Sequence, residues 1–266
     1  MKIFGNRKRE NSLYTKAQLL NQELNQEIES ISSSELQVFT QRLTDGCKAL
    51  SYTSEYTQAW YGHRYRLYLS IEWIKETLAL MGKSEIIALE TGGYSVVTDL
   101  IKQAFPVVSW SNTQGDLRYN WGYPDEYADL IVCMEVLEHV SDFPDGYQDS
   151  FLKTGLRAML KEVYRVLKPQ GCFFITTPNA ASIVQLSSIL AGYSPWFYQL
   201  HVREYSLNEL VPEIEEAGFK IAKLQTIQCL TYDTKNDYSK VFRLLVEGNF
   251  EARNRGDDIF IIAKKT

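Results

Sequence analysis

The sequence predicts an α/β protein in which a helical cap at the N-terminus precedes a doubly wound, mostly parallel sheet. Beyond Gly82, short apolar runs alternate with amphipathic stretches, which is the pattern of strands joined by crossover helices. The first 82 residues lack this alternation. Two successive strand-like runs end the chain, and the stretch between them shows no clear helical pattern. The last strand is therefore predicted to be antiparallel.

Helical periodicity dominates the N-terminal part. From about Ser12 to Leu43, apolar residues recur at helical spacing among polar ones, which predicts an amphipathic helix followed by the cap signal "SSSE". The stretch from Tyr52 to Met81 is dense in aromatic residues, becomes helical, and ends at Gly82, a residue suited to a helix C-terminus. We therefore divide the chain into a helical cap, residues 1–82, and a sheet domain, residues 83–266.

The sheet domain contains the strands and crossover helices that define the fold class. The expected strands, in chain order, are "EIIALE", "VVSW", "ADLIVCME", "GCFFITT", "FKIAKLQTI" and "DDIFIIAKK". The expected helices between them are "VVTDLIKQAF", "GLRAMLKEVYRVL" and "LNELVPEIEEAG". In a sheet of this kind the ligand binds at the carboxyl ends of the strands.

Composition narrows the class of protein. A chain of 266 residues with 45% hydrophobic residues can bury a full core. A net charge of −5 argues against a nucleic-acid partner, because phosphate binding relies on clustered Lys and Arg. Four scattered cysteines without a CxxC pair predict no disulfide framework. Without a signal peptide or a long apolar run, we expect no membrane span and a cytoplasmic location; the oligomeric state stays open.

The segment "MEVLEHV" places charged groups directly after a buried strand. Glu135, Glu138 and His139 fall where that strand ends, and charges are rarely placed there without a partner. Carboxylate oxygens and imidazole nitrogens are suitable ligands for Mg²⁺, Mn²⁺ or Zn²⁺. His201, in "HVREYS", is a candidate fourth ligand, since it follows the next strand. The alternative is that the acids cap a following helix.

Four blocks, in this order and spacing, carry a family resemblance. They are "ALETGG", "YADLIVCMEVLEHV", "EVYRVLKPQGCFFITTPN" and "HVREYSLNELVPEIEEAGF". Over residues 84 to 266 the chain resembles the class I S-adenosylmethionine-dependent methyltransferases. The resemblance implies a Rossmann-like, seven-stranded sheet with an antiparallel last strand, and S-adenosylmethionine as the cofactor.

The cofactor residues follow from this resemblance, with two departures from the family pattern. Gly92 and Gly93 would let the backbone approach the cofactor, and Glu90 would meet its amino group. Tyr94 and Val96 stand where the family usually has glycine. The family also often has an acid after the second strand, where this chain offers neutral groups. Further cofactor contacts are expected from Asn112 or Ser111 at the ribose, from Asp116 and Leu117 at the adenine, and from Glu135.

The pattern Glu-x-x-Glu-His with a later His also resembles the metal site of two branches of the superfamily. These are the terminal 2′-O-methyltransferases of small RNAs and the ubiquinone-pathway O-methyltransferases. The resemblance implies Glu135, Glu138, His139 and His201 as ligands of Mg²⁺ or another divalent ion that activates a hydroxyl. Glu138, His139 and His201 are the candidate catalytic residues. Without metal, His139 becomes the candidate general base.

The stretch from "TTPN" to "HVREY" resembles the lid of bacterial methyltransferases that accompany glycan and glycolipid assembly. Its aromatic residues Trp196, Phe197 and Tyr198 either stack on a flat acceptor or form core under a long loop. The acidic residues Asp142, Asp145 and Asp149, in the preceding connection, either flank the acceptor or form an ordinary surface loop.

The function expected from all these features is O-methylation of a hydroxyl on a small molecule or glycan, with S-adenosylmethionine as the donor. Two alternatives stay open. One is a terminal RNA 2′-O-methyltransferase, which shares the metal pattern but fits poorly with an acidic chain. The other is a non-catalytic binding or scaffold protein on a degenerate methyltransferase fold, suggested by the altered glycine loop.

Overall fold

A computed structural model of the chain describes residues 3–143, 153–194 and 196–266. The helical elements are α1 (Ile3–Glu29), α2 (Ser33–Ala49), α3 (Ser54–Gly62), α4 (Arg64–Met81), α5 (Val96–Ala104), α6 (Thr154–Val166), α7 (Ile183–Leu190), α8 (Leu207–Glu216) and α9 (Ser239–Glu247), with short 3₁₀ turns η1 (Leu137–His139) and η2 (Tyr232–Thr234). The strands are β1 (Ile86–Glu90), β2 (Val108–Asn112), β3 (Ala128–Met134), β4 (Leu167–Pro178), β5 (Phe219–Ile227) and β6 (Asp258–Lys265).

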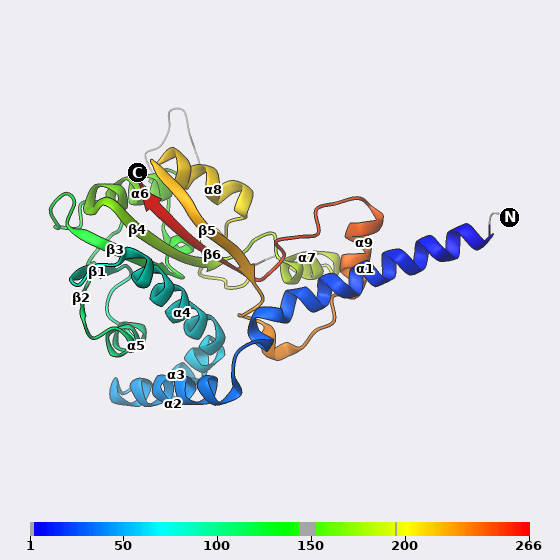
Figure 1. The fold of residues 1–266 in the computed structure, drawn as a ribbon, viewed down its shortest axis with the longest axis horizontal. Helices are drawn as coiled ribbons and strands as arrows, with labels where there is room; N and C mark the ends of the chain where they lie inside the picture. The colour runs from blue at the N-terminus through cyan, green and yellow to red at the C-terminus, as the bar shows by residue number, and fades with distance from the viewer. Residues whose placement is uncertain (1–2, 144–152, 195) are drawn as a thin grey trace.

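These strands form one mixed sheet in the order β2-β1-β3-β4-β6-β5. Strands β2, β1, β3 and β4 run parallel to one another, whereas β6 is antiparallel to both β4 and β5. The predicted antiparallel last strand is therefore confirmed, although the connection before it does contain a helix, α9, which the sequence pattern did not predict. In Figure 1, α4 and α5 lie on one side of the sheet, and α6 and α8 lie on the other. The doubly wound α/β class is confirmed as well.

The expectation of seven strands is not confirmed, because the described part of the chain forms a six-stranded sheet. The stretch between β2 and β3, residues 113–127, forms turns instead of a strand. Gly115 and Gly122 have φ values of 76° and 78° there, and Pro124 has no N–H to donate to a neighbouring strand. Leu117 and Trp121 anchor this segment by burying their side chains in the core.

Alternate strand residues supply two separate cores. On the α4 side of the sheet, Ala88, Val132, Phe174 and Phe260 belong to one buried cluster. Trp73 of α4 lies over Phe174 and Phe260, with ring centroids 6.2 and 5.4 Å apart. On the opposite face, residues such as Leu89, Ile131 and Ile175 pack with α6 and α8. A side-chain period of two places successive strand residues on these two faces.

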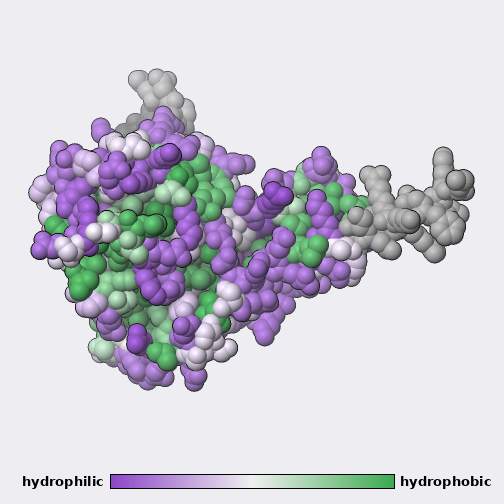
Figure 2. Space-filling view, in the orientation of Figure 1, coloured by the Kyte–Doolittle hydropathy of each residue, from purple (hydrophilic) through white to green (hydrophobic). Residues whose placement is uncertain are grey.

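The N-terminal helices divide between two places. The amphipathic helix predicted in the stretch from Ser12 to Leu43 is α1, which ends at Glu29, and the predicted cap signal "SSSE" lies at the start of α2, at Ser33. Serine residues fill the break, and the hydroxyl of Ser30 donates to the Glu27 carbonyl, which competes with continued helix. Helix α1 lies alongside α9 in an arm that extends from the sheet, and hydrophobic side chains appear among hydrophilic ones on its surface (Figures 1 and 2).

Helices α2 to α4 lie beside the sheet, apart from the arm formed by α1 and α9 (Figure 1). Helix α2 contacts α4 and α5, and α4 ends at Gly82 in the left-handed conformation, as the sequence predicts. The division at residue 82 into two domains remains a prediction. None of the helices in the described part of the chain is long and apolar enough to cross a membrane.

Candidate active site

A cavity of about 1240 Å³ opens at the carboxyl ends of β1, β3 and β4. The loops after β1 and β3 supply its floor, from Glu90 to Ser95 and from Met134 to His139. Residues of α3 and the start of α4 line another wall, together with Phe197, Tyr198 and His201. A cavity in this place matches the ligand position expected of an open α/β sheet.

The loop after β1 is built around two glycines in the left-handed region. Gly92 has φ of 93° and Gly93 has φ of 85°, which side chains with a Cβ rarely adopt. A Cβ added to Gly92 would lie 2.9 Å from Cγ2 of Val136, in the loop after β3. Glycine is therefore required both for the backbone conformation and for the close approach of these two loops, and both glycines line the cavity.

The two departures from the glycine pattern have structural partners. Val96 begins α5 fully buried, and it faces Gly46 of α2, where an added Cβ would lie 2.9 Å from Cγ2 of Val96. The small residue that permits close packing is thus on the partner helix. Tyr94 is about half exposed at the cavity, and its hydroxyl hydrogen-bonds Asp99 of α5.

Glu90 is a buried carboxyl at the end of β1. Its Oε2 accepts hydrogen bonds from Thr98 Oγ1 at 2.5 Å and from Asn112 Nδ2 at 2.8 Å. Burial outweighs these hydrogen bonds and raises the pKa of Glu90 to about 7. A positive group placed beside Glu90 would favour its ionised form.

Asn112 contacts the glycine loop and is not among the residues that line the cavity. Besides Glu90, its Nδ2 donates to the Gly93 carbonyl at 3.0 Å and to Thr98 Oγ1 at 3.1 Å. These contacts make Asn112 a support for the loop. The predicted contact between Asn112 or Ser111 and a ribose remains a prediction.

The two residues predicted at the adenine also lie outside the cavity lining. The carboxylate of Asp116 accepts from Arg118 Nη2 at 2.6 Å, and the guanidinium lowers the pKa of Asp116. Leu117 is buried in the core on the α6 side of the sheet, beside Trp121. The structure therefore gives both residues local partners, and it does not bring them to the glycine loop.

In the loop after β3, the backbone of Glu135 is in the left-handed region, with φ of 55°. Glu135 lines the cavity, where its Oε1 accepts from Thr176 Oγ1 at 2.9 Å. The turn η1 follows and directs Glu138 inward. Glu138 is fully buried, and its Oε2 accepts from Thr177 Oγ1 at 2.9 Å. Burial, with the charge of Glu135 adding to it, raises the pKa of Glu138 well above its ordinary value.

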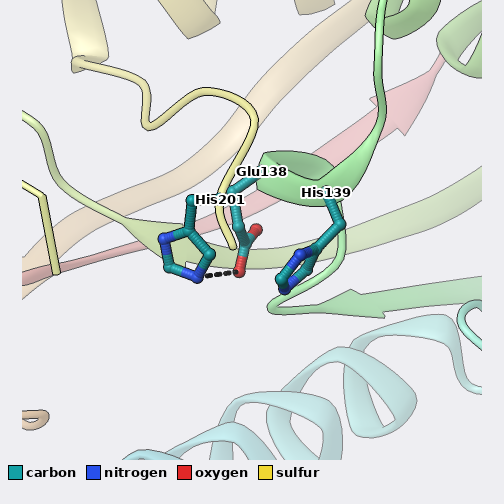
Figure 3. Close-up of side chains that lie close together, drawn as sticks. All are labelled: Glu138, His139 and His201. Atoms are coloured by element: carbon teal, nitrogen blue, oxygen red, sulfur yellow. Dashed lines mark ion pairs between the residues drawn. The ribbon is translucent and has the colours of Figure 1, made fainter. Parts of the chain in front are cut away.

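Glu138, His139 and His201 converge on one point. In Figure 3 the Glu138 carboxylate lies between the two imidazole rings. Oε1 of Glu138 is 4.0 Å from Nε2 of His201 and has no hydrogen-bond partner. The two rings have centroids 4.9 Å apart, and one ligand atom from each of the three residues lies within 4.8 Å of the other two. Glu135, the fourth predicted ligand, is not part of this group.

Backbone and side-chain contacts hold His201 in this position. The Glu138 carbonyl accepts from the N–H groups of Val202 and Arg203, at 2.8 and 3.1 Å, and so ties the two segments together. His201 Nδ1 donates to Oε1 of Glu204 at 2.6 Å, since a carboxylate oxygen only accepts, and Nε2 faces Glu138. Histidines that bind metal usually have such a second partner.

His139 is the exposed member of the group. Burial of part of the ring and the neighbouring His201 lower the pKa of His139, so its imidazole stays neutral near pH 7. A neutral imidazole can act either as a metal ligand or as a general base.

The structure describes some of the aromatic and acidic residues that the sequence analysis singled out around the site. Phe197 and Tyr198 line the cavity, whereas Trp196 is about half exposed and is not among the lining residues. Asp142 caps α6, because its carboxylate accepts from the N–H groups of Lys153 and Gly155 at 3.0 and 2.9 Å. Asp145 and Asp149 lie outside the described residues.

Sequence reasoning missed Glu204 and Arg66. Glu204 holds His201, and it accepts a second hydrogen bond from Gln185 Nε2 at 2.6 Å. Arg66 is buried in α4 and lines the cavity. One signal was available for Arg66, since it shares a helix face with Ser70 and Trp73, and an arginine on a buried face is unusual. Nothing in the local pattern marked Glu204.

Three comparisons extend these findings. A model of the methyltransferase domain family matches residues 68–224. A "Probable S-adenosylmethionine-dependent methyltransferase" from Mycolicibacterium smegmatis is 31% identical over 98 residues, which cover 37% of this chain and 31% of that protein. The match thus spans about a third of the length of that relative.

Solved structures with the same fold include a SAM-dependent methyltransferase from Archaeoglobus fulgidus, with a TM-score of 0.50 and 17% identity over 77% of this chain and 98% of that one. The search of solved structures also found a possible histamine N-methyltransferase from Thermotoga maritima, with a TM-score of 0.47 and 17% identity over 80% of this chain and 95% of that one. The family match covers more than half of the chain, and the chain therefore belongs to the methyltransferase domain family.

Proposed function

We propose that the protein transfers the methyl group of S-adenosylmethionine to a hydroxyl of a small molecule or glycan, and that a divalent metal ion bound by Glu138, His139 and His201 assists the transfer. The observation that carries this proposal is the unpartnered Oε1 of the fully buried Glu138, which faces His201 Nε2 at 4.0 Å. A buried carboxylate oxygen without a partner is costly, and a cation would compensate it.

The glycine loop supports the cofactor part of the proposal. Gly92 and Gly93 let backbone atoms approach a ligand in the cavity, and Glu90 offers a carboxyl at the same wall. Thr98 and Asn112 hold Glu90 from behind. When bound, S-adenosylmethionine supplies a methyl group that is already reactive, so the protein has mainly to orient the two reactants and exclude water.

The residues of the metal group fit a small divalent ion. Two imidazoles and one carboxylate suit Zn²⁺, Mn²⁺ or Fe²⁺, and positions remain open for a substrate oxygen. When bound, such an ion lowers the pKa of a coordinated hydroxyl. The role of Thr177 is to hold Oε2 of Glu138, and the role of Glu204 is to hold the His201 ring, so that the remaining atoms face one point.

His139 offers the metal-free version of the same reaction. Its pKa is lowered, so the ring is neutral at physiological pH and able to accept the proton of an acceptor hydroxyl. Chelation separates the two versions, because only the metal-assisted one loses activity when divalent ions are removed.

The acceptor side of the cavity favours a flat or sugar-like ring. Phe197 and Tyr198 line it, and aromatic faces stack on such groups. An RNA acceptor finds no support in the net charge of −5.

Calorimetry tests the proposal. S-adenosylmethionine is titrated into metal-free protein, first alone and then with Mn²⁺ or Mg²⁺ present. Saturable binding is expected in both cases, with additional heat from the metal titration. Glu138→Gln should keep cofactor binding and lose metal binding, whereas Glu85→Gln, an exposed residue at the opposite end of β1, should keep both. Absence of cofactor binding would contradict the proposed reaction.

A further inference from the structure

Arg66 of α4 is a buried cation without a counter-ion at contact distance. Its side chain is part of the cavity wall, yet the residue is only 2% exposed. Neither Nε nor Nη1 has a hydrogen-bond partner, and no ion pair joins Arg66 to any residue that the structure describes. Buried guanidinium groups are normally paired, because an unpaired buried charge is strongly unfavourable.

Arg64, two residues earlier in α4, shows the usual arrangement of a buried arginine. It is 6% exposed, its Nη2 donates to Asp233 at 2.6 Å, and its Nη1 donates to the Tyr61 carbonyl at 3.0 Å. Two arginines of one helix are thus equally buried, and one of them is satisfied by the protein while the other faces the cavity. The difference indicates that the N–H groups of Arg66 are available to bind a ligand in the cavity.

The groups around Arg66 do not replace that ligand. The oxygens of Glu138 are directed to Thr177 and toward His201, and no oxygen of Glu138 reaches Arg66. Asp258, at the start of β6, is fully buried, and burial raises its pKa, which weakens it as a counter-ion. His63 is neutral, since burial lowers its pKa to about 3.

Arg66 belongs to the part of the cavity away from the glycine loop. It lies two turns before Trp73 on the same face of α4, and the Trp73 ring packs on Phe174 of β4 and Phe260 of β6. In the sheet order, β4 and β6 lie beyond β3, on the side opposite to β1. The cofactor loop follows β1, so a ligand at Arg66 lies on the acceptor side of the metal group.

We propose that Arg66 binds a carboxylate of the acceptor, so that the substrate class is a hydroxylated carboxylic acid. The planar guanidinium offers Nε and a terminal nitrogen in the spacing that two carboxylate oxygens match. The inference rests on the proposed function, because it adds a charged group to the acceptor of that reaction. Loss of such a charge-assisted contact is expected to weaken acceptor binding by about 10- to 100-fold.

Acetate and acetamide are matched probes, since they have similar size and differ in charge. The full-length protein is labelled with ¹⁵N, and the arginine Nε–H signals are followed by NMR while each probe is added. The Arg66 signal is identified by its loss in Arg66→Lys. Acetate should move it in a saturable manner, and acetamide should not. The Arg64 signal is the internal control and should stay in place, because that guanidinium is already paired.

The same titration is repeated with saturating S-adenosylhomocysteine. This molecule has a carboxylate of its own, which is the alternative ligand for Arg66. Acetate should still move the Arg66 signal. A shift of that signal by S-adenosylhomocysteine alone, with loss of the acetate response, would overturn the inference and assign Arg66 to the cofactor. A signal unmoved by acetate would also overturn it. Failure of S-adenosylhomocysteine to bind would contradict the proposed function instead, and it would leave the acetate response measurable.

Discussion

The Glu138 carboxylate and the His201 ring face each other, with Oε1 and Nε2 4.0 Å apart, although the two residues lie in distant parts of the chain. The Glu138 carbonyl makes this possible, because it accepts the N–H groups of Val202 and Arg203. One residue therefore supplies both a side-chain group to the site and the backbone contact that positions its partner. Metal affinity should depend on this pair more than on any other.

Replacing Glu138 with Gln is expected to separate metal binding from folding. Gln keeps the size and can still accept from Thr177, but it removes the buried carboxylate whose desolvation is costly. We expect metal binding to be lost, while the free energy of unfolding of the metal-free protein stays equal or rises. Calorimetry and urea denaturation measure the two quantities. A fall in that free energy by about 2 kcal/mol or more would indicate a structural hydrogen bond instead.

Glu204→Gln tests the support of His201. The neutral amide can present its NH₂ to His201 Nδ1 and so favour the wrong tautomer of the ring. Metal affinity is expected to fall by about 10- to 100-fold, which is less than in Glu138→Gln. The measurement is competition for Mn²⁺ against a chelator of known affinity. Affinity equal to that of the unmodified protein would show that Glu204 only packs the loop.

Glu90 should make the stability of the protein depend on pH. Its pKa rises from 4.5 to about 7 on folding, so between these values the folded protein binds more protons than the unfolded chain. The stabilisation is therefore complete below about pH 4.5 and is lost as the pH rises toward 7, by about 3 kcal/mol in all. Urea denaturation across this range should show a smaller decrease for Glu90→Gln. Parallel curves for the two proteins would contradict the assignment.

Gly92→Ala should damage the cofactor loop in a way that Gly82→Ala does not. Both positions have positive φ, so each alanine is expected to cost about 1–2 kcal/mol of stability. Only at Gly92 would the new methyl group meet another side chain, at 2.9 Å from Val136, whereas the space at Gly82 is open. Calorimetry with S-adenosylmethionine should show weakened binding in Gly92→Ala alone. Equal affinity for S-adenosylmethionine in both variants would show that the glycine loop does not contact the cofactor.

Local patterns predicted much of this molecule. The six quoted strand segments are strands, because each is a short apolar run between turn residues. The seventh strand came only from the resemblance. Residues 117–123 do alternate apolar and polar residues, but Gly115, Gly122 and Pro124 bound this short run, and it forms turns.

The sequence singled out Glu138, His139 and His201, and the structure brings these three residues together; their role as a site remains a prediction. The adenine contact of Asp116 also remains a prediction, and in the structure the carboxylate of Asp116 accepts from Arg118, two residues away. Arg66 and Glu204 show a limit of the sequence pattern. Their importance depends on which groups become buried beside them, and burial is a property of the folded chain that spacing alone does not encode.

Electron paramagnetic resonance of Mn²⁺ tests the central claim most directly. Mn²⁺ is titrated into metal-free protein, and the spectrum of the bound ion is examined for coupling to histidine nitrogen. The account predicts a single saturable site with nitrogen coupling, absent from Glu138→Gln and unchanged in Glu85→Gln. No saturable site, or a site that persists in Glu138→Gln, would contradict a metal centre at Glu138, His139 and His201.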